Sequence, residues 1–209
     1  RACLFIFAPI TAIFIALRLP LLRLVWEGGN FSYNDTLTLI PPFIAYCVGM
    51  MGLACENVLN QSFYAQMRPW APTIIGIIAS IIFVVTATLG VHWGWGLAAI
   101  AGAESLQKTV KCLIMWRVLR PQLGEINRRE NALFFAKTAL CSVFAAIVAA
   151  ILVKIVGPSD LADASRVRMA LAILISGSGA MLAFGVLASL LKVEEMKHVG
   201  AFLKREQRR

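Results

Sequence analysis

Charged residues are scarce in this sequence, and the motifs of common enzyme classes are missing. Asp, Glu, Lys and Arg together make up 15% of the 209 residues. No H-E-x-x-H, G-x-S-x-G, P-loop or dinucleotide-binding pattern occurs. The five cysteines lie singly in apolar stretches, without the spacing of metal ligands. The sequence therefore predicts no catalysis, no metal and no cofactor, and we expect the cysteines to be free thiols that pack as small hydrophobes.

Hydrophobic residues are abundant instead. They make up 59% of the chain, and the mean hydropathy is +0.77, whereas a soluble domain is about 45–50% apolar. Six apolar segments reach the length of about 20 residues that crosses a bilayer. Because backbone groups in lipid must bond within the segment, we expect helices. The predicted fold is an all-α, polytopic membrane helix bundle with six transmembrane helices, at 2–25, 37–59, 73–91, 97–118, 132–156 and 167–191.

Charge alternates between the connecting stretches. The stretch 26–36 holds acidic residues and no lysine or arginine, 117–131 holds four arginines, and 157–165 holds two aspartates. The positive-inside rule then places both ends of the chain in the cytoplasm. The net charge of +9 is explained by this topology, so we expect no nucleic-acid partner. The final stretch, 192–209, predicts a basic amphipathic helix on the membrane surface.

Polar residues inside two of these segments are the candidate functional residues. A carboxylate or amide in lipid is costly, so such groups should face protein or water. Glu104 and Lys108 are spaced i, i+4, which allows an ion pair along one helix. This ion pair could have either a structural or a functional role. The candidates from this argument are Glu56, Asn57, Asn60, Glu104 and Lys108.

Four of the residues in the second segment share one helical face, because their spacing is i, i+3, i+7 and i+11. They are Gly49, Gly52, Glu56 and Asn60. The side chains on this face are small at one end and polar at the other. The face could therefore be either a packing seam or the wall of a cavity. In the same segment we expect Asp35 to cap the helix and the pair Pro41–Pro42 to bend it.

Several stretches occur in an order that resembles the MurJ (MviN) family of lipid II flippases, within the larger group of multidrug and polysaccharide exporters. They are Pro9 and Pro20, the G-x-F-x-x-x-D turn of Gly29, Phe31 and Asp35, the run IAYCVGMMGL at 44–53, Phe63-Tyr64-Ala65 with Pro72, and GLA from Gly96. The resemblance covers nearly the whole chain and is weak over the last two helices. The chain begins with Arg1 rather than Met, and we expect a C-terminal fragment of a longer protein.

The resemblance implies a carrier that moves lipid II across the bacterial inner membrane by alternating access, for cell-wall synthesis. Residues 1–119 would be four helices of the C-terminal transporter lobe, 120–131 a cytoplasmic basic loop, and 132–191 a final helix pair that could hold the lipid tail. The partners would be a lipid-linked oligosaccharide, membrane lipids and an N-terminal lobe. Arg1 matches a cavity arginine of the family, whose charge suits a diphosphate. The residues alone also allow Arg1 to be an interfacial anchor.

Two other functions stay open from the sequence. The chain could belong to an exporter of the same superfamily that carries another polysaccharide-lipid or a small cation, because buried carboxylates suit ion coupling. It could also be a membrane scaffold whose polar residues only hold helices together.

Overall fold

The computed structural model describes residues 1–28, 30–122, 128–157 and 166–191. Within this part of the chain it contains seven α-helices and one short 3-10 helix. The helices are α1 (Ala2–Ala16), α2 (Arg18–Trp26), α3 (Tyr33–Ala65), α4 (Trp70–His92), α5 (Gly96–Leu119), η1 (Arg120–Gln122), α6 (Arg128–Val156) and α7 (Arg166–Leu190). The all-helical prediction is confirmed. The predicted tail at 192–209 lies outside the described residues.

Four of these helices, α3, α4, α6 and α7, are long and apolar enough to cross a membrane. The pair α1 and α2 would make a fifth span if taken together, with a bend of 75° between them. α5 has 24 residues, but every 18-residue stretch of it holds three or more charges, so it falls outside the set. A helical membrane protein is thereby supported, and the sixth span stays a prediction.

The first predicted span is broken at Leu17. Pro20 has no N–H to donate to the carbonyl of Ala16, and its ring clashes with that carbonyl, so α1 ends there. The guanidinium of Arg18 donates to the carbonyl of Ile15 over 3.0 Å, which satisfies one of the freed groups. The segment 2–25, predicted as one span, is therefore two helices.

α3 continues as one helix through Pro41 and Pro42. Its N-cap is Ser32, so the expectation that Asp35 is the N-cap residue is wrong. Asp35 instead occupies the third helical position of a capping box: its backbone N–H donates to Ser32 Oγ over 3.4 Å, and the Ser32 N–H donates to Asp35 Oδ2 over 2.8 Å. Before this cap, Gly28 and Phe31 exchange backbone hydrogen bonds across a turn.

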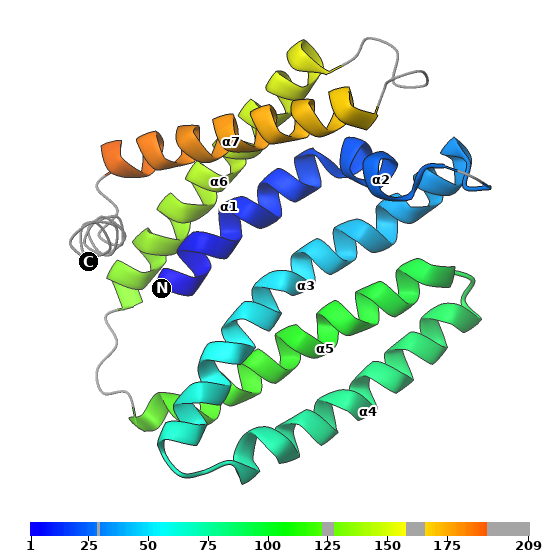
Figure 1. Ribbon diagram of the computed structural model, residues 1–209. Coiled ribbons are helices and arrows are strands. Elements are labelled where there is room, and N and C mark those ends of the chain that lie inside the picture. Colours follow the sequence, from blue (N-terminus) through cyan, green and yellow to red (C-terminus); the bar gives the residue numbers. More distant parts are fainter. Residues whose placement is uncertain (29, 123–127, 158–165, 192–209) are drawn as a thin grey trace. The chain divides into compact units, whose positions relative to one another are not determined.

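The described helices form two compact units. In one unit, α6 packs against both α1 and α7 (Figure 1). The rings of Phe5 and Phe184 join α1 to α7, with centroids 5.1 Å apart. Ala145, Ala149 and Ala180 have no exposed surface, because small side chains let helices approach closely. The small residues of α6 and α7 thus serve helix packing. The sequence grouped the first helix with the next three, and this division into a lobe and a final pair stays a prediction.

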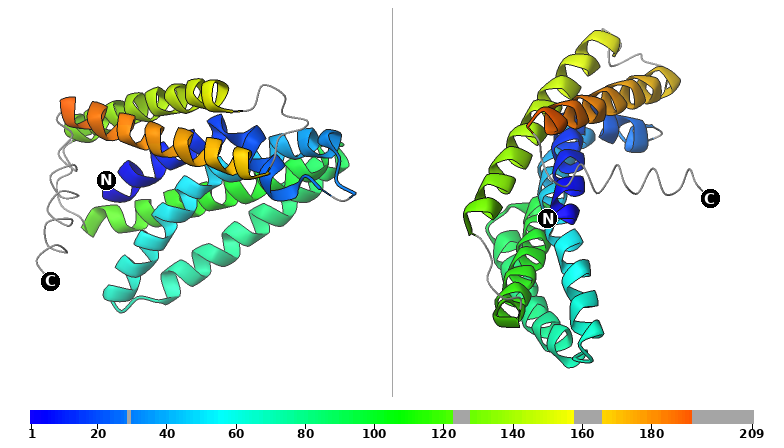
Figure 2. Two further views of the ribbon diagram at one scale, coloured as in Figure 1. Left: turned by 45° about the horizontal axis from the view of Figure 1, so that its top comes forward. Right: turned by 90° about the vertical axis from the view of Figure 1, so that its left-hand side faces the viewer.

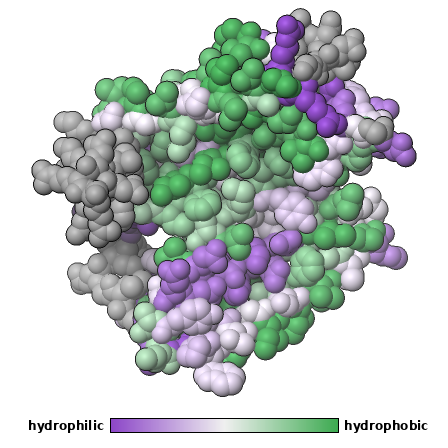
Figure 3. Space-filling view, viewed as in Figure 1, coloured by the Kyte–Doolittle hydropathy of each residue, from purple (hydrophilic) through white to green (hydrophobic). Residues whose placement is uncertain are grey.

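In the other unit, α5 lies between α3 and α4, which touch each other little (Figures 1 and 2). α4 runs antiparallel to α5, and α3 runs parallel to it. A small apolar core joins the three helices, formed by Leu59, Phe63, Ile75, Met115 and Leu119. Large apolar side chains such as Ile74, Ile77 and Ile81 stay exposed on the outer side of α4. Figure 3 shows such apolar surface over much of the viewed face, as a lipid environment requires.

Candidate functional site

The contact between α3 and α5 is built on two glycines. A Cβ on Gly49 would lie 3.1 Å from the Cα of Ser105, and one on Gly52 would lie 3.2 Å from the carbonyl carbon of Lys108. The backbones meet so closely that the Ser105 hydroxyl donates to the carbonyl of Ala45 on the other helix. The face predicted as either a seam or a cavity wall is, at these positions, a packing seam.

Glu56 lies on the same face, one turn beyond Gly52, and is the centre of a charged cluster. Its Oε1 accepts a hydrogen bond of 2.6 Å from Lys111 Nζ, and its Oε2 lies 3.5 Å from Lys108 Nζ. The side chains are 7% exposed for Glu56, 16% for Lys111 and 25% for Lys108. We name these three residues the charge cluster. With two formal positive charges and one formal negative charge, the charge cluster has a formal net charge of +1.

Lys111 also contacts α4. A Cβ on Gly76 would lie 3.5 Å from Lys111 Nζ. The Lys111 ammonium therefore packs against α4 at a position that has no side chain. The charge cluster therefore lies where the three helices of this unit meet, directly beside the apolar core that contains Leu59 and Met115. The low dielectric of such surroundings strengthens the attraction between the charges, and it also makes an unpaired charge costly.

The other candidates on α3 and α5 lie around this cluster. The Oδ1 of Asn60, one turn beyond Glu56, is buried and has no hydrogen-bond partner among the described residues. Asn57 is exposed and points off the seam. Glu104 is half-buried and lies close to the hydroxyl of Tyr46. The predicted pair of Glu104 with Lys108 does not form among the described residues, because Lys108 reaches across to Glu56 on the neighbouring helix.

Arg1 belongs to the other unit and is held by the start of α6. Its Nε donates to Asn131 Oδ1 over 2.6 Å, and its Nη2 lies 3.8 Å from Glu130 Oε2. The guanidinium also lies over the ring of Phe134, 5.9 Å from the centroid. These contacts join the beginnings of α1 and α6. Arg1 and the charge cluster belong to different compact units.

Lys111 was not among the candidate residues predicted from the sequence, although it makes the shortest contact with Glu56. A signal was present: Lys108 and Lys111 are spaced i, i+3, so both reach the same neighbour. The partner on α3 is 55 residues away from Lys111. That long-range pairing depends on which helices pack together, and hydrophobic periodicity does not specify it.

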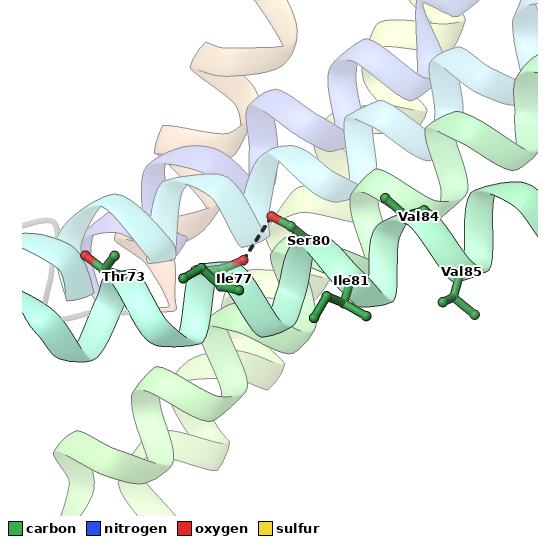
Figure 4. A pocket seen from close by; sticks show the side chains of 7 residues that line it. Thr73, Ile77, Ser80, Ile81, Val84 and Val85 are labelled. Atoms are coloured by element: carbon green, nitrogen blue, oxygen red, sulfur yellow. Dashed lines mark hydrogen bonds between the residues drawn. The ribbon is translucent and has the colours of Figure 1, made fainter.

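No metal centre is found in the part of the chain that the structure describes, since it holds no group of three His, Cys, Asp or Glu side chains. Among the described residues of this unit, some surface depressions lie away from the charge cluster. One, of about 530 Å³, is lined by α4 alone, between Thr73 and Val85. Figure 4 shows it with mostly apolar side chains, and the Ser80 hydroxyl in it donates to the carbonyl of its own helix at Gly76. These depressions include no predicted site residue.

Comparisons of the sequence and of the structure with known proteins point to the same family. A family model described as lipid II flippase MurJ matches residues 1–159. The probable lipid II flippase MurJ of Haemophilus influenzae is 28% identical over 124 residues, which are 59% of this chain and 24% of that protein. The protein of the same description from Treponema pallidum is 28% identical over 130 residues, 61% of this chain and 24% of its own length.

A solved structure shares the fold. It is entitled lipid II flippase MurJ, inward closed conformation, and it aligns with a TM-score of 0.60 and 20% sequence identity. The alignment covers 90% of this chain and 36% of the solved one. The chain therefore spans about a quarter of the length of the curated relatives and about a third of the solved protein.

Proposed function

This chain belongs to the MurJ family of lipid II flippases, and on that premise we propose that it forms the C-terminal part of a carrier for lipid II. The carrier takes its substrate across the bacterial inner membrane by alternating access, and it thereby supplies peptidoglycan synthesis. The observation that carries this proposal is the family match over residues 1–159. The work is transport rather than catalysis.

The charge cluster supports a role in holding an anionic lipid headgroup. It has one more positive than negative charge, and Lys108 is its most exposed member. The ammonium of Lys108 lies 3.5 Å from Glu56, so it makes no short hydrogen bond there and keeps donors for a phosphate oxygen. In this proposal, Asn57, Asn60 and Glu104 line the same path, and Arg1 stays a separate candidate for binding the headgroup.

The cluster proposal has its own test. Lys108→Gln in the full-length protein should lower the rate at which lipid II reaches the outer leaflet. Lys154→Gln, which removes an exposed lysine at the end of α6, is the matched control and should leave that rate unchanged. Equal rates for both variants would exclude Lys108 from the substrate path.

The proposed topology has six spans with both ends of the chain in the cytoplasm. Single cysteines at two exposed positions test it, Gln66 at the end of α3 and Trp95 before α5. With a thiol reagent that cannot cross membranes, the cysteine at 95 should react in intact cells, and the one at 66 only after the membrane is opened. The reverse pattern would overturn the orientation.

Depletion of the protein tests the function itself. The full-length gene product that contains this chain is placed under a repressible promoter, and lipid II exposed on the periplasmic face is labelled. We expect labelling to fall as the protein is lost and to return when the full-length protein is supplied. Unchanged labelling would refute the flippase proposal.

An exporter for another polysaccharide-lipid or a small cation is the second candidate, and the burial of Glu56 is the observation that favours it. Glu56→Gln should then abolish ion-driven export, measured per amount of folded protein in the membrane because this variant is also destabilised. A scaffold without transport is the third reading, and it predicts that depletion changes neither lipid II labelling nor export.

A further inference from the structure

One side of α5 is polar along two turns of the helix. Four residues spaced i, i+3, i+4 and i+7 share this side, and they are Glu104, Gln107, Lys108 and Lys111. All four are half-buried. The opposite side of the helix carries exposed apolar side chains, which are Leu106, Leu113 and Trp116. We name the four polar residues the polar face.

The polar face reaches both neighbouring helices. Toward α3, Lys108 and Lys111 contact the carboxylate of Glu56. Toward α4, Gln107 Nε2 donates to Ser80 Oγ over 3.5 Å. Because α3 and α4 touch each other little, the side chains of the polar face stay partly accessible between the two helices.

Glu104 lies at the middle level of the neighbouring helices. The next residue, Ser105, donates to the carbonyl of Ala45 on α3, and Gln107, one turn away, donates to Ser80 on α4. Both acceptors lie near the middle of their helices, and both helices are long and apolar enough to cross a membrane. In the proposed topology the carboxylate of Glu104 is thus far from either membrane surface. An ionisable group at such a depth is costly and typically has a function.

Glu104 differs from Glu56 in its partners. Glu56 is held by two lysines, whereas Glu104 forms no ion pair in the part of the chain that the structure describes. Its polar neighbour on α3 is the hydroxyl of Tyr46. A carboxylate has about four acceptor sites, so most of those on Glu104 stay open to a ligand.

The open acceptors determine which groups Glu104 can bind. An ionised carboxylate accepts hydrogen bonds and donates none, so it suits hydroxyl and amide N–H groups and repels a phosphate. Lys108 lies one helical turn away, about 6 Å along the axis, and its ammonium suits a phosphate oxygen. The two residues together fit a ligand in which hydroxyl-bearing groups follow a phosphate, as in a sugar joined to a diphosphate.

We propose that Glu104 is a specificity-determining residue, which accepts hydrogen bonds from sugar hydroxyls of the lipid headgroup while Lys108 holds the diphosphate. This inference rests on the proposed function and assigns a direction to the bound headgroup. Lys108 is closer than Glu104 to the cytoplasmic end of α5 in the proposed topology, so the sugar lies farther from the cytoplasm than the diphosphate. A lipid without sugar is disfavoured, because it leaves the acceptors of Glu104 unpaired.

The experiment measures binding to the purified full-length protein in lipid nanodiscs. Two probes are compared: an isoprenyl diphosphate, and the same lipid with a disaccharide on its diphosphate. The natural protein should bind the disaccharide lipid more tightly. Glu104→Gln should weaken binding of the disaccharide lipid by about tenfold or more, because hydrogen bonds to a charged group are lost, and it should leave binding of the other probe unchanged. Lys108→Gln should weaken binding of both probes by the same factor.

Thr88→Val is the matched control, since this exposed hydroxyl on α4 donates to the carbonyl of Val84 on its own helix. Both affinities should keep their natural values in this variant. Glu104→Ala removes the acceptors completely and should weaken binding of the disaccharide lipid at least as much as Glu104→Gln. Affinities are taken per amount of folded protein.

Three results would overturn the proposal. If Glu104→Gln weakened binding of both probes equally, Glu104 would act on the diphosphate or on an ion and not on the sugar. If it weakened neither, Glu104 would not contact the headgroup. Binding of neither probe by the natural protein would refute the carrier proposal as well, which separates that failure from the first two.

Discussion

Replacing Glu56 by Gln should destabilise the protein strongly, because it removes the single anion of the charge cluster. The carboxylate accepts a hydrogen bond of 2.6 Å from Lys111 and lies 3.5 Å from Lys108, with 7% of its side chain exposed. Its loss raises the net charge of the cluster from +1 to +2 in a low-dielectric site. Breaking a buried pair in this way costs about 3–5 kcal/mol.

Replacing a partner of Glu56 should reduce the free energy of unfolding by less than replacing Glu56 itself. Lys111→Met leaves Glu56 paired with Lys108, so the loss should be limited to a charged hydrogen bond, about 1.5–3 kcal/mol. Combining Glu56→Gln with Lys111→Met removes both members of the close pair. The double variant should be less destabilised than the sum of the single ones, because fewer charges are left without a partner.

The measurement is the free energy of unfolding of the purified full-length protein, titrated with sodium dodecyl sulfate in mixed micelles. Glu104→Gln is the matched control, since Glu104 lies on α5, is half-buried and makes no ion pair among the described residues. Its effect should stay below about 1 kcal/mol. If Glu56→Gln were as mild as Glu104→Gln, the charge cluster would not hold α3 to α5, and the argument from burial would fail.

Two further predictions concern the seam and the cap of α3. Gly49→Ala should destabilise by about 1–3 kcal/mol, because its Cβ would meet Ser105. Gly102→Ala, with nothing within 4 Å, should instead stabilise α5 by about 0.5–1 kcal/mol. Ser32→Ala removes the capping box and should cost about 1 kcal/mol, whereas Ser62→Ala breaks only a bond within its own helix and should change less than about 0.5 kcal/mol.

The same unfolding titration reads out both pairs of variants. Effects of the same sign and size for the two glycine variants would show that α3 and α5 are not in close contact at this level. If Ser62→Ala lowered the free energy of unfolding as much as Ser32→Ala, the hydroxyl of the N-cap would have no special role in stability.

Helix ends were partly predictable from the sequence. The apolar segment predicted at 73–91 corresponds to α4 at Trp70–His92, and the one at 97–118 corresponds to α5 at Gly96–Leu119. Proline was a less reliable guide. Pro20 coincides with a break, whereas α3 passes through Pro41 and Pro42 without ending. All remove one backbone donor, so the outcome depends on whether the surroundings hold the helix in place.

The candidate site was predictable in composition but not in pairing. Spacing placed Gly49, Gly52 and Glu56 on one face, and the structure packs that face against α5. Spacing also suggested a bond between Glu104 and Lys108 on one helix, whereas Lys108 reaches Glu56 on another. A pair within one helix is favoured by a few tenths of a kcal/mol. A buried counter-charge is worth more than that, so the tertiary partner prevails.

Length and hydropathy alone determined that this chain is a set of membrane helices, because backbone groups in lipid must bond within their own segment. The order of several short motifs, carried on those helices, was enough to identify the family. Only the tertiary structure decided that Glu56 meets Lys111 and Lys108. The physical reason is that helical periodicity specifies which residues share a face, whereas the partner of that face depends on how closely two backbones can approach, and here glycine decides it.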